Sequence, residues 1–307
     1  MNPPELSRKL KEKAFALGFE LAGVAAASPS PDYPFFLEWI SKGYAGEMGY
    51  LERRKQERGD PSSLLPGAKS VFCAGLSYNP QARHYPLLEK HPISCYAWGR
   101  DYHEVLWEKL ESLSGYLCGV LVPGAKAKAY VDTGPVLERS YAAQAGLGWV
   151  GKNTLLLNKT FGSFLFLGEI LTDAELEPDS PTENLCKTCT ACLDACPVGA
   201  LEEPGLLNAT KCISYLTLEH RSGFGGPVDL HGYLAGCDLC QTVCPYNTNA
   251  PEGREPAFQP RPEILELTIK KASDMGEGDF RKFTRNSALE RVKHPMWKRN
   301  TTAMGQK

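Results

Sequence analysis

Eight of the eleven cysteines of this chain fall in one short segment, and their spacing is the clearest chemical signal in the sequence. Cys186, Cys189, Cys192 and Cys196 follow the pattern C-x2-C-x2-C-x3-C, and Pro197 comes directly after them. This is the spacing of bacterial ferredoxins, in which three cysteines hold one 4Fe–4S cluster and the fourth holds another. Zinc sites favour C-x2-C pairs with four ligands for each ion, so the spacing predicts iron–sulfur clusters instead.

A second, incomplete set of cysteines follows further along the chain. Cys237, Cys240 and Cys244 precede Pro245 in the pattern C-x2-C-x3-C-P, which lacks one ligand, and Cys212 is the nearby candidate. Because the last cysteine of each run crosses to the other cluster, the two ligand sets can be assigned. We expect cluster 1 to be held by Cys186, Cys189, Cys192 and Cys244, and cluster 2 by Cys196, Cys212, Cys237 and Cys240. Two such clusters form a path for single electrons, which predicts an electron acceptor elsewhere in the chain.

The part of the chain before these cysteines is large enough to hold that acceptor. Helices are predicted over 1–40 and 103–118, and strands are predicted over 70–77, 127–131 and 163–171. Strands that alternate with helices predict an α/β domain with a mixed sheet.

Proline-rich and acidic stretches divide the chain into three parts. We expect a catalytic domain over 1–172, a ferredoxin-like domain with two clusters over 173–250, and a helical, basic tail over 251–307. The boundary segment 173–183 is acidic and contains two prolines, which is typical of a linker.

The composition limits the class of protein. The net charge of -2 excludes a strongly basic nucleic-acid binder but leaves room for a local basic patch. No apolar stretch has the length of a membrane span, and residues 1–20 form an amphipathic pattern rather than a signal peptide. We therefore expect a cytoplasmic protein, in which thiols stay reduced and disulfides do not explain the cysteines.

Several motifs outside the cysteine runs resemble the signature of one known family. They are residues 46–48, 65–71, 96–103, 131–139, 145–154 and 212–217. The match extends over about residues 40–250 and resembles the epoxyqueuosine reductases. The resemblance implies a cobalamin-binding domain related to reductive dehalogenases, followed by the two-cluster domain. It also implies the last step of queuosine synthesis, in which an epoxide at the wobble position of tRNA becomes an alkene with loss of water.

The resemblance also implies site residues and partners. Asp132, in the turn D-T-G-P, would be the proton donor and would need a raised pKa; the alternative is an Asx turn that holds its own backbone. The expected cobalamin contacts are Lys55, Cys95, Asp132, Asn153, Ser214 and Asp238. The expected tRNA contacts are Arg139, Arg221, Arg285, Arg291 and Lys293. The electrons would come from an external one-electron donor of the flavodoxin or ferredoxin type, and the chain would act as a monomer.

No histidine is assigned to the cobalt of that cofactor. The pattern D-x-H-x-x-G often accompanies a cobalamin with a displaced lower base, and Asp101 with His103 and Asp229 with His231 begin it. Leucine occupies the place of the glycine in both cases. A lone histidine is more often a satisfied surface or core residue than a metal ligand.

One departure from the family pattern concerns the C-terminal region. Family members usually continue into helical HEAT-like repeats that help to hold tRNA, whereas this chain ends at Lys307. We therefore expect the basic tail, a truncated form of that region, to carry an unusually large share of tRNA binding. Two other functions remain open from the sequence alone: an iron–sulfur electron-transfer protein, and a cobalamin-dependent reductive dehalogenase of small molecules.

Overall fold

A four-stranded sheet organises the first half of the molecule. The computed structural model describes residues 1–80, 84–88 and 90–305. Its sheet has the order β1-β2-β6-β3, made by β1 (Leu21–Ala26), β2 (Ser70–Ser77), β6 (Leu165–Thr172) and β3 (Ala127–Tyr130). The expected combination of helices with one sheet is confirmed, but the expected mixed sheet is wrong, because each of the three pairings is antiparallel, which is the α+β rather than the α/β arrangement. Helices between strands do not fix strand direction, since a long connection can return to either end of a sheet.

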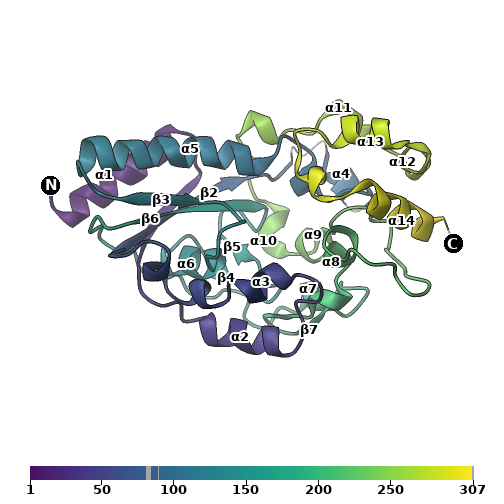
Figure 1. The fold of residues 1–307 in the computed structure, drawn as a ribbon, viewed down its shortest axis with the longest axis horizontal. Helices are drawn as coiled ribbons and strands as arrows, with labels where there is room; N and C mark the ends of the chain where they lie inside the picture. The colour runs from purple at the N-terminus through teal and green to yellow at the C-terminus, as the bar shows by residue number, and fades with distance from the viewer. Residues whose placement is uncertain (81–83, 89, 306–307) are drawn as a thin grey trace.

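Helices cover both faces of this sheet (Figure 1). Helices α1 (Pro3–Ala16) and α5 (Tyr102–Tyr116) pack on one face, and α6 (Glu138–Gln144) packs on the other. Shorter elements between them are α2 (Tyr33–Ser41), α3 (Gly49–Arg53), α4 (Tyr85–Leu88) and the strand pair β4 (Trp149–Val150) with β5 (Leu156–Leu157). The layers fix the ends of β3 and β6, from which the site described below is built.

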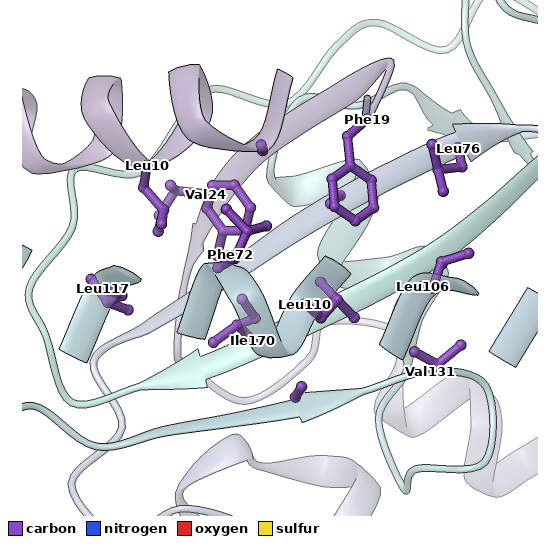
Figure 2. Packing of buried hydrophobic residues seen from close by; sticks show 14 of the residues in the cluster. Leu10, Phe19, Val24, Phe72, Leu76, Leu106, Leu110, Leu117, Val131 and Ile170 are labelled. Carbon is purple, nitrogen blue, oxygen red and sulfur yellow. The ribbon is translucent and has the colours of Figure 1, made fainter. Parts of the chain in front are cut away.

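The alternation of side chains along β2 explains the two cores. Phe72, Ala74 and Leu76 point to the face covered by α1 and α5, whereas Val71 and Cys73 belong to the cluster on the α6 face. Figure 2 shows the first core, with labelled side chains from both helices and from the strands. Each fully buried Leu or Phe contributes roughly 1.5–3 kcal/mol through removal of apolar surface from water.

The expectation of a helix throughout residues 1–40 is wrong at β1. Helix α1 ends before Gly18, which has a positive φ of 93°, and the alanine-rich segment that follows is the edge strand β1. A Cβ at Gly23 would lie 2.1 Å from the carbonyl oxygen of Ala145 behind the sheet. Tertiary packing therefore decides the conformation of this segment, since its alanine content alone favours a helix.

The cysteine region forms a compact module with little regular structure. It contains the strand pair β7 (Leu201–Glu203) with β8 (Leu206–Leu207) and the helices α7 (Ala191–Asp194), α8 (Ile213–Leu218), α9 (Leu239–Thr242) and α10 (Pro245–Thr248). The 251–307 tail follows with α11 (Pro262–Leu265), α12 (Ile269–Asp274), α13 (Glu277–Thr284) and α14 (His294–Met304). Helix α14 packs against α8 of the module (Figure 1).

The three parts predicted from the sequence share one of their cores. Trp98 and Trp297 are both almost fully buried in a cluster that joins segment 88–98, residues of the cysteine module and the tail. Their indole nitrogens donate to backbone carbonyls of Ile93 and Ala272, at 2.7 and 2.9 Å. One hydrophobic core therefore extends across both predicted boundaries, at 172 and at 250. No helix in the described ranges is long and apolar enough to cross a membrane.

Candidate active site and cluster module

Asp132 stands at the end of β3 in a backbone conformation that is unusual for its residue type. Its φ is 53°, in the left-handed region, and its N–H donates to Oε1 of Glu138 at 2.5 Å. The carboxylate is 58% exposed and approaches Nε2 of His103 at 3.3 Å. This contact runs across the fold to α5, so the carboxylate is aimed away from its own turn.

His103 lies between two carboxylates at the start of α5. Asp101 caps this helix by accepting from the backbone N–H of His103, and its Oδ1 also lies 2.7 Å from Nδ1 of the ring. Burial acts to lower the pKa of His103, but the hydrogen bonds to Asp101 and Asp132 outweigh burial and raise the pKa to about 9. The ring is therefore an imidazolium at neutral pH.

The charge on His103 corrects the expectation of a raised pKa for Asp132. Desolvation by the surrounding protein atoms acts to raise the pKa of this carboxyl, but the hydrogen bond and charge of His103 outweigh it and hold the pKa below its usual value. At neutral pH the proton of the pair therefore resides on His103, and Asp132 is its acceptor.

Two further carboxyl groups lie behind the Asp132 loop. Burial, and then the charge of Asp132, raises the pKa of Glu138 to about 7. Glu169, on β6, is fully buried, and its pKa is raised well above the usual value by burial and then by the charge of Glu138. In the described part of the chain neither Glu169 oxygen has a hydrogen-bond partner other than this neighbouring carboxyl.

Arg58 approaches the same loop from another direction. Its side chain is buried, and Nη1 donates to the carbonyl oxygens of Gly134 and Val136, both at 3.3 Å. A Cβ at Gly134 would lie 2.3 Å from the ring of Tyr130, so the turn also requires glycine here. The loop is thus fixed by contacts with three separate elements.

The structure brings the expected cluster 1 cysteines around one cavity. A cavity of about 140 Å³ is lined by Cys186, Cys189, Cys192 and Cys244, together with residues that include Lys152 and Tyr246. Within the described ranges no three Cys, His, Asp or Glu side chains close around a single ion. The four thiols instead face a shared space, which is the arrangement that a cluster of several iron atoms requires.

The other four cysteines form a neighbouring group. Cys212 lies near Cys196, Cys237 lies near both, and Cys240 lies near Cys237 and Cys212. Cys240 also has Cys192 of the first group among its neighbours. The grouping is that of the two expected ligand sets, and the sets adjoin each other at Cys192 and Cys240.

Two of the expected cobalamin contacts, Asp238 and Cys95, are buried side chains. The Asp238 side chain is fully buried, and its carboxylate accepts from Oγ of Ser94 at 2.5 Å and from the N–H of Cys95 at 2.7 Å. Cys95 is 3% exposed. These hydrogen bonds join Asp238, beside the second cysteine group, to segment 94–96.

The remaining expected cobalamin contacts differ in their surroundings. Asn153 is 4% exposed and donates to the carbonyl of Cys240 at 3.4 Å, so it faces the cysteine loops. Lys55 is exposed and pairs with Glu52 at 3.6 Å, and Ser214 is half-buried at the start of α8. With the exposed Asp132, Lys55 and Ser214 are the expected contacts that have surface available.

Two of the expected tRNA contacts, Arg221 and Arg291, contact each other, and a third lies close to them in sequence. Nη1 of Arg221 donates to the carbonyl of Arg291 at 3.2 Å, and Lys293 follows two residues later. The Arg291 guanidinium lies 5.5 Å from the centre of the Tyr50 ring and forms two hydrogen bonds with Glu219.

Asp132 lies near that group. It is a charged neighbour of both Tyr50 and Arg291. Arg139 is on α6 next to the loop and donates to the carbonyl of Thr154, whereas Arg285 is exposed at the end of α13.

Sequence reasoning missed four residues of this site: Arg58, His103, Glu138 and Glu169. His103 was examined only as a cobalt ligand, although Asp101 two residues earlier is a helix-capping signal. Glu169 is a lone acid within the apolar run 163–171, which is itself a signal of function. For Arg58 and Glu138 the pattern of residue types offers no comparable signal.

Comparison with known proteins follows the same division of the chain. Residues 58–133 match the family model described as Epoxyqueuosine reductase QueG, DUF1730, and residues 185–247 match a 4Fe-4S double cluster binding domain. The epoxyqueuosine reductase of Gloeobacter violaceus is 43% identical over 97% of this chain and 95% of the relative. That of Escherichia coli K12 is 38% identical over 96% of this chain and 79% of the relative. Relatives therefore differ in how much sequence lies outside the match.

Solved structures agree with these relatives. A crystal structure of epoxyqueuosine reductase with an epoxyqueuosine-modified tRNA-Tyr stem loop is 34% identical, with a TM-score of 0.88 over 97% of this chain and 80% of that chain. A Bacillus subtilis epoxyqueuosine reductase with its catalytic aspartate loop swung out of the active site is 33% identical, with a TM-score of 0.86 over the same shares. Near-complete coverage by such relatives favours the reductase over the two alternatives left open by the sequence. The chain belongs to the epoxyqueuosine reductase family.

Proposed function

We propose that this chain reduces epoxyqueuosine to queuosine at the wobble position of tRNA, with two 4Fe–4S clusters and cobalamin as cofactors. The observation that carries the proposal is the Asp132–His103 pair. Asp132 has Arg291 and Tyr50 as neighbours, and also Tyr96, which in turn neighbours Asp238 beside the second cysteine group. Conversion of an epoxide to an alkene with loss of water consumes two electrons and two protons. The chain offers a path for the electrons and a relay that would deliver the protons one at a time, with solvent reprotonating the partly exposed His103 between the two transfers.

Electrons would enter at cluster 1 and leave from cluster 2. Cys189 is exposed, so cluster 1 is the one open to an external one-electron donor of the flavodoxin or ferredoxin type. Cys192 and Cys240 bring the two sets together, and Asp238 joins the second set to segment 94–96. Tyr96 in that segment has both Asp238 and Asp132 as charged neighbours. The proposed ligand sets are the two predicted from the cysteine spacing, and we propose that the chain works as a monomer.

Cobalamin would be held between segment 94–96 and the Asp132 loop. When bound, it supplies a cobalt centre that collects single electrons and attacks strained carbon. Asp132, Lys55 and Ser214 have side-chain surface to contact it. Asn153, Cys95 and Asp238 would support it indirectly, by holding the cysteine loops and segment 94–96 in place.

The proton would reach the opening epoxide from the His103–Asp132 pair. A developing alkoxide needs a proton donor within hydrogen-bond reach, and the Asp132 side chain is exposed for that contact. Asp132 is ionised and His103 is protonated at neutral pH, and the two side chains are 3.3 Å apart, so His103 would pass its proton to Asp132 as Asp132 protonates the alkoxide. Asp132 would be the donor to substrate, and His103 its supply.

The rim near the pair has the composition of a nucleic-acid contact. Arg221, Arg291 and Lys293 provide positive charge, and the Tyr50 ring is 38% exposed. Guanidinium and ammonium groups position phosphates, and exposed aromatic rings stack on bases of single-stranded RNA. Arg139 and Arg285 are the remaining proposed contacts with the RNA.

The direct test is single turnover of an epoxyqueuosine-containing anticodon stem loop by anaerobically reconstituted protein, read by mass spectrometry of the digested RNA. Wild-type protein should convert the nucleoside and contain about eight iron atoms per chain. Asp132→Asn should retain iron and cobalamin but lose turnover on the order of a hundredfold. Stoichiometric zinc without iron would reject the clusters, and unchanged turnover in Asp132→Asn would remove this residue from the reaction.

A further inference from the structure

The loop that carries Asp132 is held by two charged side chains that do not face the proposed substrate. Oε1 of Glu138 accepts the N–H of Asp132 at 2.5 Å. Further along the loop, Nη1 of Arg58 donates to the carbonyls of Gly134 and Val136, both at 3.3 Å. The Glu138 carboxyl thus fixes the start of the loop by accepting from a backbone N–H. The Arg58 guanidinium fixes the middle of the loop by donating to two backbone carbonyls.

This restraint matters because the conformation of Asp132 is unfavourable in isolation. A φ of 53° places a residue with a Cβ in the left-handed region, which the surrounding structure must enforce. The hydrogen bond from its N–H to Glu138 fixes the orientation of the peptide plane. Because that plane determines where the side chain points, the same bond keeps the carboxylate facing His103.

Glu138 is itself supported by a residue of the central sheet. Glu169 lies next to it on β6, a strand paired with both β2 and β3, and is fully buried. Two adjacent carboxyls, of which Glu169 is fully buried and Glu138 half-buried, do not both ionise, and desolvation raises the pKa of each. The pair therefore retains one proton, which lets two acids pack together behind the loop.

We propose that Glu138 is the positioning residue for the Asp132 loop: supported by Glu169 and opposed by Arg58, it holds the Asp132 carboxylate against His103. Glu138 acts through the backbone of Asp132 and contacts neither substrate nor cofactor. The proposal rests on the proposed role of Asp132 in the reaction. It adds a distinct claim, that the half-buried carboxyl of Glu138 keeps the loop in its working position.

Hydrogen exchange of peptides covering residues 131–137, measured without cofactor or RNA, tests this claim directly. Glu138→Ala removes the acceptor, so exchange of the loop amides should accelerate roughly tenfold or more. Glu138→Gln keeps an oxygen for the Asp132 N–H and an amide for Glu169, and should restore protection to near the wild-type level. Glu12→Ala is the matched control, since Glu12 belongs to an exposed ion pair on α1.

Turnover provides the second readout. In reconstituted protein, Glu138→Ala should lower kcat roughly tenfold, with the KM for the RNA stem loop unchanged, because the loop orients the acid and does not bind RNA. Glu138→Gln should recover most of that loss. The proposal would be overturned if the loop amides of Glu138→Ala exchanged at the wild-type rate. It would also be overturned if those of Glu138→Gln exchanged as fast as those of the alanine variant.

Two further outcomes are separated by design. If Glu138→Ala does not fold, as judged by far-UV circular dichroism, Arg58→Lys takes its place. A single ammonium cannot bridge both carbonyls in the geometry of a guanidinium, so loop exchange should again accelerate, and unchanged exchange would count against the proposal. If Asp132→Asn leaves turnover intact, the proposed acid fails, while hydrogen exchange still decides whether Glu138 holds the loop.

Discussion

At the scale of single residues, the site depends on where protons reside. Three carboxyls and one imidazole adjoin the same loop, and their surroundings separate their pKa values. Hydrogen bonds raise the pKa of His103 to about 9, while burial raises that of Glu138 to about 7 and that of Glu169 well above its usual value. The pKa of Asp132 alone is lowered. The exposed Asp132 carboxylate thus has a protonated imidazole beside it that can supply a proton. The other two carboxyls, Glu138 and Glu169, can support the loop.

The charge of His103 leads to a prediction about pH. His103 is protonated below its pKa of about 9 and neutral above it, so turnover should be retained through neutrality and fall as the pH rises through about 9. In His103→Gln this fall should vanish, with turnover roughly tenfold lower at neutral pH because the supply of protons is lost. Single-turnover rates between pH 6 and 10 provide the measurement. An alkaline limb that persists in His103→Gln would assign it to another group.

At the scale of elements, short loops and helices bring the cysteines together. Cys212 precedes α8 and Cys196 follows α7, so two separate segments contribute to the second group. Lys152, in the loop between β4 and β5, supports the first group of cysteines. Its ammonium donates to the carbonyls of Lys187 and Cys189 at 2.6 and 2.8 Å. Such contacts, together with the clusters when they are bound, would order these loops.

The assignment of Cys212 gives a prediction for this module. Cys212→Ala should lose cluster 2 alone, so that iron falls from about eight to about four atoms per chain, because cluster 1 keeps its four ligands. Cys118→Ala, a half-buried cysteine at the end of α5, is the matched control and should keep all its iron. Metal analysis and electron paramagnetic resonance after anaerobic purification measure the loss. Full iron content in Cys212→Ala would require a different fourth ligand.

At the scale of the whole molecule, the tail is packed into the body of the protein. Trp297 is fully buried beside residues of the catalytic part, and the N–H of Asp101 donates to the carbonyl of Asn286 at 2.9 Å. Residues 288–291 continue from there to Arg291, which adjoins Tyr50 and lies near Asp132. The tail therefore forms one wall of the proposed RNA site, which links its folding to substrate binding.

Salt dependence can show which tail residues meet phosphate. Arg285→Gln and Lys293→Gln should each weaken binding of the stem loop and flatten the slope of log affinity against log salt by roughly 0.7 to 0.9 per lost contact. Arg291 is less suitable, because its pair with Glu219 also holds the fold together. Arg8→Gln on α1 is the control and should leave the slope unchanged. Unaltered affinity and slope in both variants would move attention to segment 53–55.

The sequence by itself determined the chemistry that local spacing encodes. Cysteine ligands of a cluster are read from short intervals, because a loop of two or three residues can place thiolates around one cube and few other sites share that spacing. The strand at 70–77 was also predictable with its bounds, since a continuous apolar run fits a buried strand. The turn that begins at Asp132 was predictable from its glycine and proline and from the family resemblance.

Only the tertiary structure decided the charges and contacts around that turn. Asp132 and His103 are 29 residues apart, so no local pattern revealed that they meet or that the proton belongs to His103. Burial of Asp238 likewise depends on segment 94–96, which is distant in the chain. The support of the Asp132 loop by Glu138, Glu169 and Arg58 comes from three elements that are joined only by the packed sheet. Burial and long-range hydrogen bonds set these properties, and both arise only after the chain has folded.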